Sequence, residues 1–170
     1  MGLLSVFKGD TLHFNQNAVP VLNDIFSQLN ALEASTEKEI LIKMLITANK
    51  GIDILFHPDS GIIKNKVKSF NREAFYVLYE IIILFLILSL KNVNFKNADH
   101  VKETFITTLD RTDECNALWT EMDEFNKKDE RILKPIWKKI SSYAQGLKRE
   151  NELVFVSAFT DLFRKFAGYV

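Results

Sequence analysis

Glu80 is the residue whose type and surroundings best suit chemistry, because it is the only charged residue between Glu73 and Lys91. Tyr76 and Tyr79 precede it at spacings of four and one, so the three polar groups share one stripe of a helix. Burial would raise the pKa of this carboxyl group and make it a candidate acid or ligand contact. A structural role, with the carboxylate facing solvent or bonded to a tyrosine or lysine, is the favoured alternative. Tyr76, Tyr79 and Glu80 are therefore the candidate ligand-binding residues.

His57, Asp59 and Ser60 carry the three groups of a hydrolytic triad within four residues. In a triad the base stands between nucleophile and acid, and its members come from distant parts of the chain. Neighbours in a tight turn cannot adopt that arrangement. Pro58 and Gly61 are typical of a turn in which Asp and Ser bond their own backbone. We predict a turn here and assign no catalytic residue.

The sequence offers no convincing set of metal ligands. Residues 110–121 begin with Asp and end with Glu, as a calcium loop does, but Cys115 stands where the loop needs glycine. His100 and Glu103 share a helical face, whereas di-iron bundles need two Glu-x-x-His pairs. Glycine-rich phosphate-binding motifs are also missing from the sequence. We expect no metal and no cofactor.

The overall composition argues against some partners. Lys and Arg number 22 and Asp and Glu also number 22, so the positive excess typical of nucleic-acid-binding proteins is missing. Acidic residues gather in 110–130 and basic residues in 131–149, which indicates complementary faces of neighbouring helices. The single Cys115 fits a reducing compartment, and the N-terminus lacks a signal-peptide pattern. We expect a cytoplasmic protein that does not bind nucleic acid.

Helical periodicity runs through most of the chain, with apolar residues three and four apart. The expected helical segments are 17–32, 36–56, 71–91, 97–126, 135–147 and 151–167, and residues 97–126 could form one helix or two. A capping box is predicted at Thr36–Glu39, and Ser69 or Asn71 is the expected cap of the third segment. The fold class is therefore all-α, a six- or seven-helix, mostly antiparallel bundle. We expect residues 1–170 to form one domain, with 1–15 as an irregular arm or small hairpin.

The segment of about 71–90 is the most apolar in the chain. Residues 81–88 contain no polar side chain, and a helix that is apolar all round must be enclosed by its neighbours. A membrane span needs about 20 apolar residues, but the uncharged stretch here is half as long and follows Glu80. We predict the central helix of the bundle and no membrane insertion.

The last predicted helix carries a wide aromatic face, in a chain that contains 14 Phe in 170 residues. A single chain of this size would struggle to cover every such face, and symmetric dimers commonly bury the remainder. We therefore suspect a homodimer, with Phe159, Phe163 and Phe166 as the candidate interface residues.

Three classes of function are compatible with these observations. We favour a non-catalytic helical interaction or regulatory module that binds a protein partner, because the sequence shows no nucleophile motif, metal set or cofactor loop. The first alternative is a protein that binds an apolar small molecule in a pocket between helices. The second is an enzyme whose dispersed active site is not visible in the sequence, since helical bundles host many activities.

Overall fold

The computed structural model describes residues 17–60, 62–63, 70–128, 133–144 and 146–168. The predicted arm or hairpin at residues 1–15 lies outside these residues. The described residues form seven α-helices and one 3₁₀ turn, and none of them belongs to a strand. The α-helices are α2 (Ala18–Asn30), α3 (Thr36–Phe56), α4 (Arg72–Asn92), α5 (Ala98–Thr108), α6 (Thr112–Lys127), α7 (Lys134–Tyr143) and α8 (Arg149–Ala167). The all-α fold class is confirmed.

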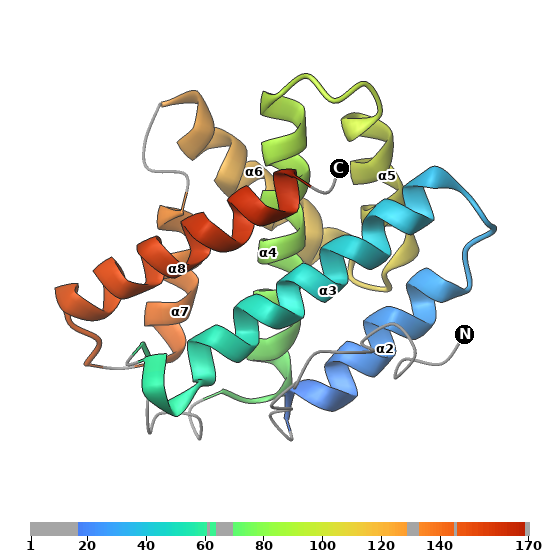
Figure 1. Cartoon of the computed structure of the whole chain (residues 1–170). Helices are drawn as coiled ribbons and strands as arrows, with labels where there is room; N and C mark the ends of the chain where they lie inside the picture. Colours follow the sequence, from blue (N-terminus) through green and yellow to red (C-terminus); the bar gives the residue numbers. More distant parts are fainter. Residues whose placement is uncertain (1–16, 61, 64–69, 129–132, 145, 169–170) are drawn as a thin grey trace.

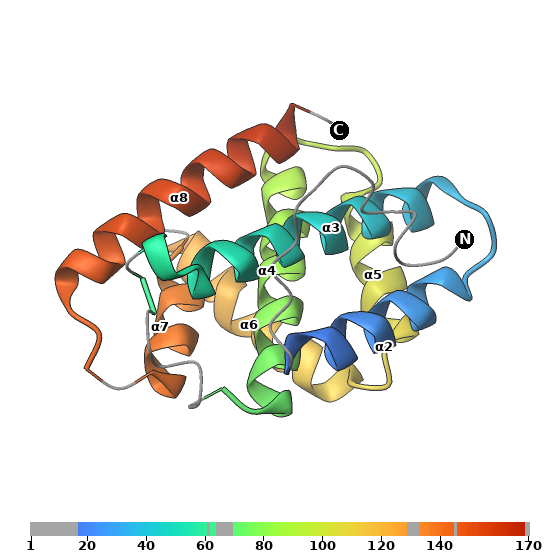
Figure 2. The ribbon, with the colours of Figure 1, turned by 60° about the horizontal axis from the view of Figure 1, so that its bottom comes forward.

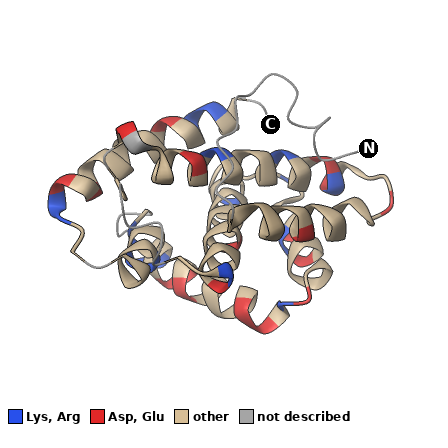
Figure 3. Cartoon of the chain, turned by 90° about the horizontal axis from the view of Figure 1, so that it is seen from below, with Lys and Arg blue, Asp and Glu red and all other residues tan. Residues whose placement is uncertain are grey.

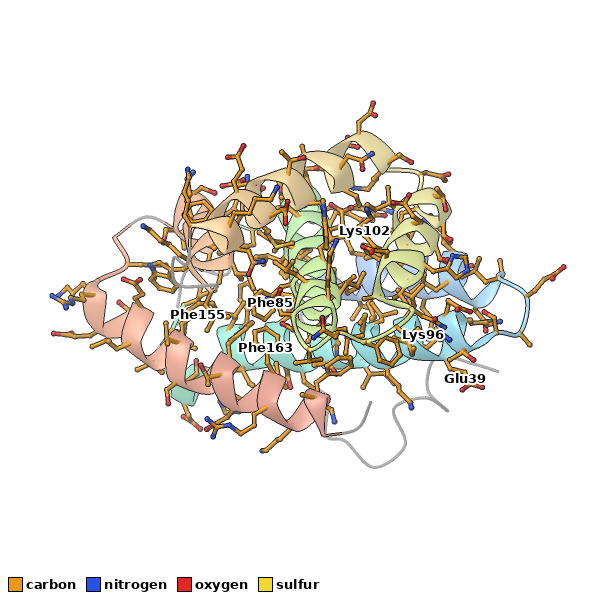
Figure 4. The ribbon with its side chains drawn as sticks, turned by 90° about the horizontal axis from the view of Figure 1, so that it is seen from above. Glu39, Phe85, Lys96, Lys102, Phe155 and Phe163 are labelled. Atoms are coloured by element: carbon orange, nitrogen blue, oxygen red, sulfur yellow. The ribbon has the colours of Figure 1, made fainter. Side chains whose placement is uncertain are left out.

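Helix α4 lies at the centre of the bundle, as predicted. Helices α2 and α3 form an antiparallel pair, and α8 runs beside α3 on its other side (Figures 1 and 2). Seen from above, α4 lies between α3 and α8 on one side and α5 and α6 on the other (Figure 4). Helix α4 packs directly against α2, α3, α5, α6 and α7. This arrangement encloses a helix that has no polar face in its second half.

The burial of α4 explains how so apolar a segment belongs to a helical bundle. Every side chain from Ile81 to Leu88 is buried, with at most 5% of its surface exposed. Helix α4 is long and apolar enough to cross a membrane by length and composition, yet 78% of its apolar window is buried inside the protein. Core helices of soluble proteins pass the same test of length and composition. The structure therefore accounts for the apolar run through packing between helices.

Residues 98–126, which the sequence left open, form two helices. Leu109 adopts an extended conformation that ends α5. Helix α6 begins at Thr112, whose hydroxyl donates a hydrogen bond to the carbonyl of Ile106 at 3.2 Å. The short turn between the two helices places Asp110 and Arg111 beside α2 and α4.

The helix caps agree with the sequence in part. Asn71 caps α4, since its side chain accepts a hydrogen bond from the Ala74 backbone N–H at 2.9 Å. The predicted capping box at Thr36–Glu39 is wrong by one residue. Ser35 is the cap of α3, because it is the residue in the extended conformation and its side chain accepts from the backbone N–H of Lys38.

The aromatic face of α8 packs inside the single chain. Phe163 stacks on Phe85 of α4 with ring centroids 4.4 Å apart (Figure 4), and Phe155 and Phe159 lie 4.5 Å apart. Gly51 permits this approach of α8 to α3, because a Cβ atom there would lie 3.1 Å from the Phe159 ring. The α8 rings thus belong to the core that joins α3, α4 and α8.

Candidate functional site

The stripe of polar residues predicted on α4 divides among three neighbouring elements. Tyr76 points toward α2, Tyr79 toward α3, and Glu80 toward the turn between α5 and α6. Successive residues on a helix are separated by about 100°, so this division follows from the helix geometry. The structure therefore does not bring the three predicted ligand-binding groups into one pocket, and their role in binding stays a prediction.

Glu80 is paired with Arg111, a residue that the sequence analysis did not select. The Nε atom of Arg111 donates to Oε1 of Glu80, whereas Oε2 of Glu80 is buried and has no hydrogen-bond partner. The other two nitrogens of the guanidinium donate to both oxygens of Glu73, at 3.0 and 2.6 Å. Arg111 thus holds one exposed and one fully buried carboxylate on the same face of α4.

Tyr76 extends this cluster to α2. Its ring lies under the guanidinium of Arg111, 4.8 Å from the centroid, and its hydroxyl donates to Asp24 at 2.5 Å. Arg72 donates to the same hydroxyl at 3.2 Å. Gln28 donates to Asp24 at 3.1 Å and accepts from the backbone N–H of Asp110 at 3.2 Å. Together these contacts fix the turn between α5 and α6 against α2 and α4.

Tyr79 forms a separate buried contact. Its hydroxyl donates to the side-chain oxygen of Asn49 on α3 at 2.6 Å, and both residues are buried. Burial raises the pKa of Tyr79, so the hydroxyl keeps its proton and remains a donor. This hydrogen bond satisfies two polar groups that would otherwise be unpaired at the α3–α4 contact.

Burial dominates the electrostatics around Glu80. Removal from water raises the pKa of Glu80 to about 7, even though the hydrogen bond and the charge of Arg111 act in the opposite direction. Burial, together with the nearby charge of Glu80, raises the pKa of Cys115 on α6 to about 12. Glu80 has no accessible surface, so no substrate reaches its carboxyl group in this conformation. The geometry indicates a structural role for this cluster.

The segment around His57 forms a turn, as predicted. Pro58–Ser60 is a 3₁₀ turn in which the hydroxyl of Ser60 donates to the carbonyl of His57 at 2.9 Å. The backbone N–H of Asp59 donates to the His57 ring at 3.1 Å. Across the described part of the chain, no three His, Cys, Asp or Glu side chains gather as ligands of a metal ion would.

The acidic and basic segments also pair as expected. Acidic residues are spaced along α6, at the lower edge of Figure 3. Lys138 and Lys139 on α7 approach the carboxylate of Glu121 on α6 at 3.2 and 3.3 Å. The charge segregation in the sequence therefore corresponds, in part, to ion pairs between consecutive helices.

Hollows in the surface lie along the outward face of α3. One, of about 490 Å³, lies between α3 and the end of α2 and is lined by Phe26, Ile42 and Lys43, among others. Another, of about 300 Å³, lies between α3 and α8 and is lined by Lys43, Ile46 and Phe166, among others. The two grooves meet at Lys43. We call this region, from Lys38 to Lys50 with its flanks on α2 and α8, the α3 surface.

The α3 surface combines apolar and basic side chains. Ile42 and Ile46 are only partly buried and pack against the edge of the core that includes Leu41, Met44 and Leu45. Lys43 and Lys165 are exposed and form no ion pair with a described residue. The sequence signal that was overlooked is this pair of isoleucines, four residues apart on the polar side of an amphipathic helix.

The three candidate interface residues all make contacts within the single chain. Phe159 and Phe166 are buried within the chain, and Phe163 is partly buried against Phe85. The larger apolar side chains that are most exposed among the described residues are Val93, Leu153 and Val154. The apolar surplus that motivated the suspected homodimer is thus largely absorbed by one chain, and the dimer stays a prediction.

Taken as a class, the molecule is an all-α bundle with a buried ion-pair cluster and an apolar, lysine-flanked surface groove. No family model matches the chain, and neither a curated protein nor a solved structure matches it.

Proposed function

We propose that this chain is a non-catalytic helical interaction module that binds a protein partner through the α3 surface. The observation that carries the proposal is the pair of grooves that meet at Lys43 and run along both sides of α3. Grooves with an apolar floor and a polar rim are the typical receptors of partner segments. A second copy of the chain is included among the partners, and we place the module in the cytoplasm.

The state of the polar residues supports binding without catalysis. Glu80, Tyr79 and Tyr76 are each occupied by a partner within the chain, and Glu80 has no accessible surface. A general acid or base must come within hydrogen-bond reach of its substrate. These residues therefore serve the proposed module by holding α2, α3 and the α5–α6 turn against α4.

The alternative function, binding of an apolar small molecule, has one observation in its favour. The groove between α2 and α3 measures about 490 Å³, within the range of about 300–1,000 Å³ typical of ligand pockets. Native mass spectrometry of the purified full chain distinguishes the two functions. A retained lipid or metabolite at one equivalent would favour this alternative.

The proposal is tested by photo-crosslinking in cells from single positions of the full chain. A benzophenone amino acid replaces Lys43, which is exposed at the junction of the grooves, or Thr120, which is exposed on α6. We expect a discrete crosslinked protein from position 43 and none from position 120. The crosslink should disappear when Ile46 is also replaced by Glu, because a charge would be buried in the interface.

The same experiment contradicts the proposal if positions 43 and 120 give the same pattern of crosslinks. It also contradicts the proposal if the product from position 43 persists in the Ile46→Glu variant. Circular dichroism and thermal unfolding of each variant confirm that the helices are intact before the crosslinks are compared.

A further inference from the structure

We propose that the partner segment is an acidic amphipathic α-helix of about three turns, which lies along α3 between α2 and α8. The inference rests on the proposed function and specifies the chemistry of the partner at the same surface. It is carried by the length of the α3 surface, the positions of its apolar side chains and the distribution of its charges.

The length of the surface matches a short helix. Lys38 and Lys50, which line the two grooves at opposite ends, are twelve residues apart on α3, or about 18 Å. A partner helix of about twelve residues has the same length and makes about three turns. Helices α2 and α8 flank α3 on its two sides (Figures 1 and 2), so a segment lying over α3 would be bordered by α2 toward Lys38 and by α8 toward Lys50.

The apolar side chains of the surface are spaced as a helix requires. Ile42 and Ile46 lie one turn apart near the middle of the surface, and both are only partly buried. Phe26 of α2 and Phe166 of α8 line the grooves on either side of them. A partner with apolar residues at positions i, i+4 and i+7 would place one apolar stripe over this floor.

The charges of the surface favour an acidic partner. Lys43, Lys50 and Lys165 line the groove between α3 and α8, and no acidic residue of the described chain lines it. The other groove holds Lys43, Lys38 and one acidic residue, Glu39. The ammonium of Lys38 already donates to the carbonyls of Asn30 and Leu32, so Lys43 and Lys165 are the cations that we assign to the partner. Asp or Glu residues flanking the apolar stripe would complement them.

A helical partner fits this surface better than an extended one. An extended peptide binds most commonly by adding a strand to a sheet edge. The described residues of this chain contain no strand, so they offer no such edge. A groove bounded by helices instead receives the side chains of one helix face.

The inference is tested by selecting helical peptides against the immobilised full chain. The display library keeps a helix-favouring frame of four turns and randomises both apolar and charged positions. We expect the enriched peptides to carry an apolar i, i+4, i+7 stripe flanked by Asp and Glu. Their affinity should fall about tenfold or more in a Lys43→Glu, Lys165→Glu double variant, and it should fall with rising salt.

A matched control carries the same change of charge elsewhere. Lys128 and Lys148 are exposed and line neither groove, so a Lys128→Glu, Lys148→Glu double variant should bind the selected peptides as the parent chain does. Peptides in which Lys replaces each Asp and Glu should bind the Lys43→Glu, Lys165→Glu variant better than the parent. Equal losses in the two double variants would contradict the inference.

The outcomes separate this inference from the proposed function. Enriched peptides that are neutral or basic, but lose binding in Ile46→Glu, would overturn the acidic helix and leave the α3 surface as the binding site. Peptides that bind the Ile46→Glu variant and the Lys43→Glu, Lys165→Glu variant with the affinity of the parent chain would overturn both proposals. A third outcome is that no peptide binds, whereas phosphatidylserine vesicles bind the parent chain but not the Ile46→Glu variant. This outcome would assign the surface to a membrane and overturn the proposed partner helix.

Occupation by the chain itself is examined with two further measurements. Residues 3–7 include Leu3, Leu4, Val6 and Phe7, and a variant with Ser at these four positions should bind the peptides with unchanged affinity. A higher affinity would assign the groove to this segment of the same chain and overturn the proposal. If sedimentation shows a dimer, and the Lys43→Glu, Lys165→Glu change dissociates it, the groove would be assigned to a second copy of the chain.

Discussion

Arg111 approaches Glu80 from the turn between α5 and α6 and hydrogen-bonds only one of its two carboxylate oxygens. The Arg111 side chain is 18% exposed and the Glu80 side chain is fully buried, so the ion pair connects the surface of the molecule to its interior. The second oxygen, without a partner, keeps the cost of burying the charge high. Burial is the main reason why the pKa of Glu80 rises to about 7 despite the adjacent cation.

Removing Arg111 should destabilise the protein strongly. Arg111→Ala leaves Glu80 buried without its counter-ion, and breaking such a pair costs about 3–5 kcal/mol. We expect a loss of this size in urea denaturation at pH 8. The loss should be smaller at pH 5, where Glu80 can be protonated. Arg111→Lys is the matched control and should lose less, since it keeps the charge but not the two-pronged contact with Glu73. Equal stability of Arg111→Ala and the parent would show that the pair is not formed.

Replacing Glu80 with Gln should change how stability depends on pH. The folded-state pKa of about 7 lies above the ordinary value of 4.5, so the folded state favours the protonated form. The stability that protonated Glu80 gives the folded state is therefore fully present below about pH 4.5, and it is lost as the pH rises to about 7. The parent should lose up to about 3 kcal/mol relative to Glu80→Gln over this range. Denaturation curves at several pH values measure it, and a difference that is constant with pH would contradict the assignment.

The hydrogen bond between Tyr79 and Asn49 should contribute through the group it leaves unpaired. Tyr79→Phe removes the donor and buries the oxygen of Asn49 without a partner, at a cost of about 1–3 kcal/mol. A second change, Asn49→Leu, should recover part of this loss, because no buried polar group then remains. Tyr76→Phe serves as the comparison, because Tyr76 is only partly buried. Urea denaturation of the parent and the three variants is the measurement, and a double variant less stable than Tyr79→Phe would contradict the explanation.

Phe85 should be among the costly positions of the core. It is 5% exposed and stacks on Phe163, so Phe85→Ala removes a contact between α4 and α8 and leaves a cavity. Such truncations cost about 3–5 kcal/mol. Phe85→Leu, which keeps more of the volume, should cost less. A loss below about 1 kcal/mol in denaturant would show that α4 is not enclosed as the structure has it.

Cys115 should be unreactive in the folded protein. The thiol is buried, and burial raises its pKa to about 12, so thiolate is scarce at neutral pH. Modification by a disulfide reagent at pH 8 should be about 1,000-fold slower than in guanidinium-unfolded protein. A fast reaction under native conditions would reveal opening of α6 away from α4.

The helices were predictable because their apolar period is local information. The repeat in residues 36–56 and the polar-free stretch at 81–88 gave the bounds of α3 and the centrality of α4 before any packing was known. The cap of α4 was narrowed to Ser69 or Asn71 in the same way, and Asn71 is the cap. Each of these features depends on residues within about one turn of one another.

The break between α5 and α6 and the partner of Glu80 were not predictable from local pattern. Arg111 lies 31 residues from Glu80 and 38 from Glu73, so only the packing of the α5–α6 turn on α4 brings them together. Likewise, only the packing of α2 and α3 on α4 brings Asp24 to Tyr76 and Asn49 to Tyr79. The packing of the α8 rings within the chain was not predictable for the same reason, since the sequence pattern does not show that Gly51 leaves room for Phe159.

The central position of α4 has a consequence for synthesis of the chain. Helices α2 and α3 precede α4, whereas α5, α6 and α7, which cover its other side, follow it. Roughly 50 residues must therefore be added after Asn92 before α5, α6 and α7 are all synthesised, which takes about 3–10 s at a rate of about 5–20 residues per second. Helix α8, whose Phe163 packs on Phe85, follows later still. During that interval a stretch long and apolar enough for a bilayer emerges from the ribosome only half covered. The nascent chain would then be a substrate for the cellular factors that shield or sort apolar segments, although the finished protein buries most of the segment.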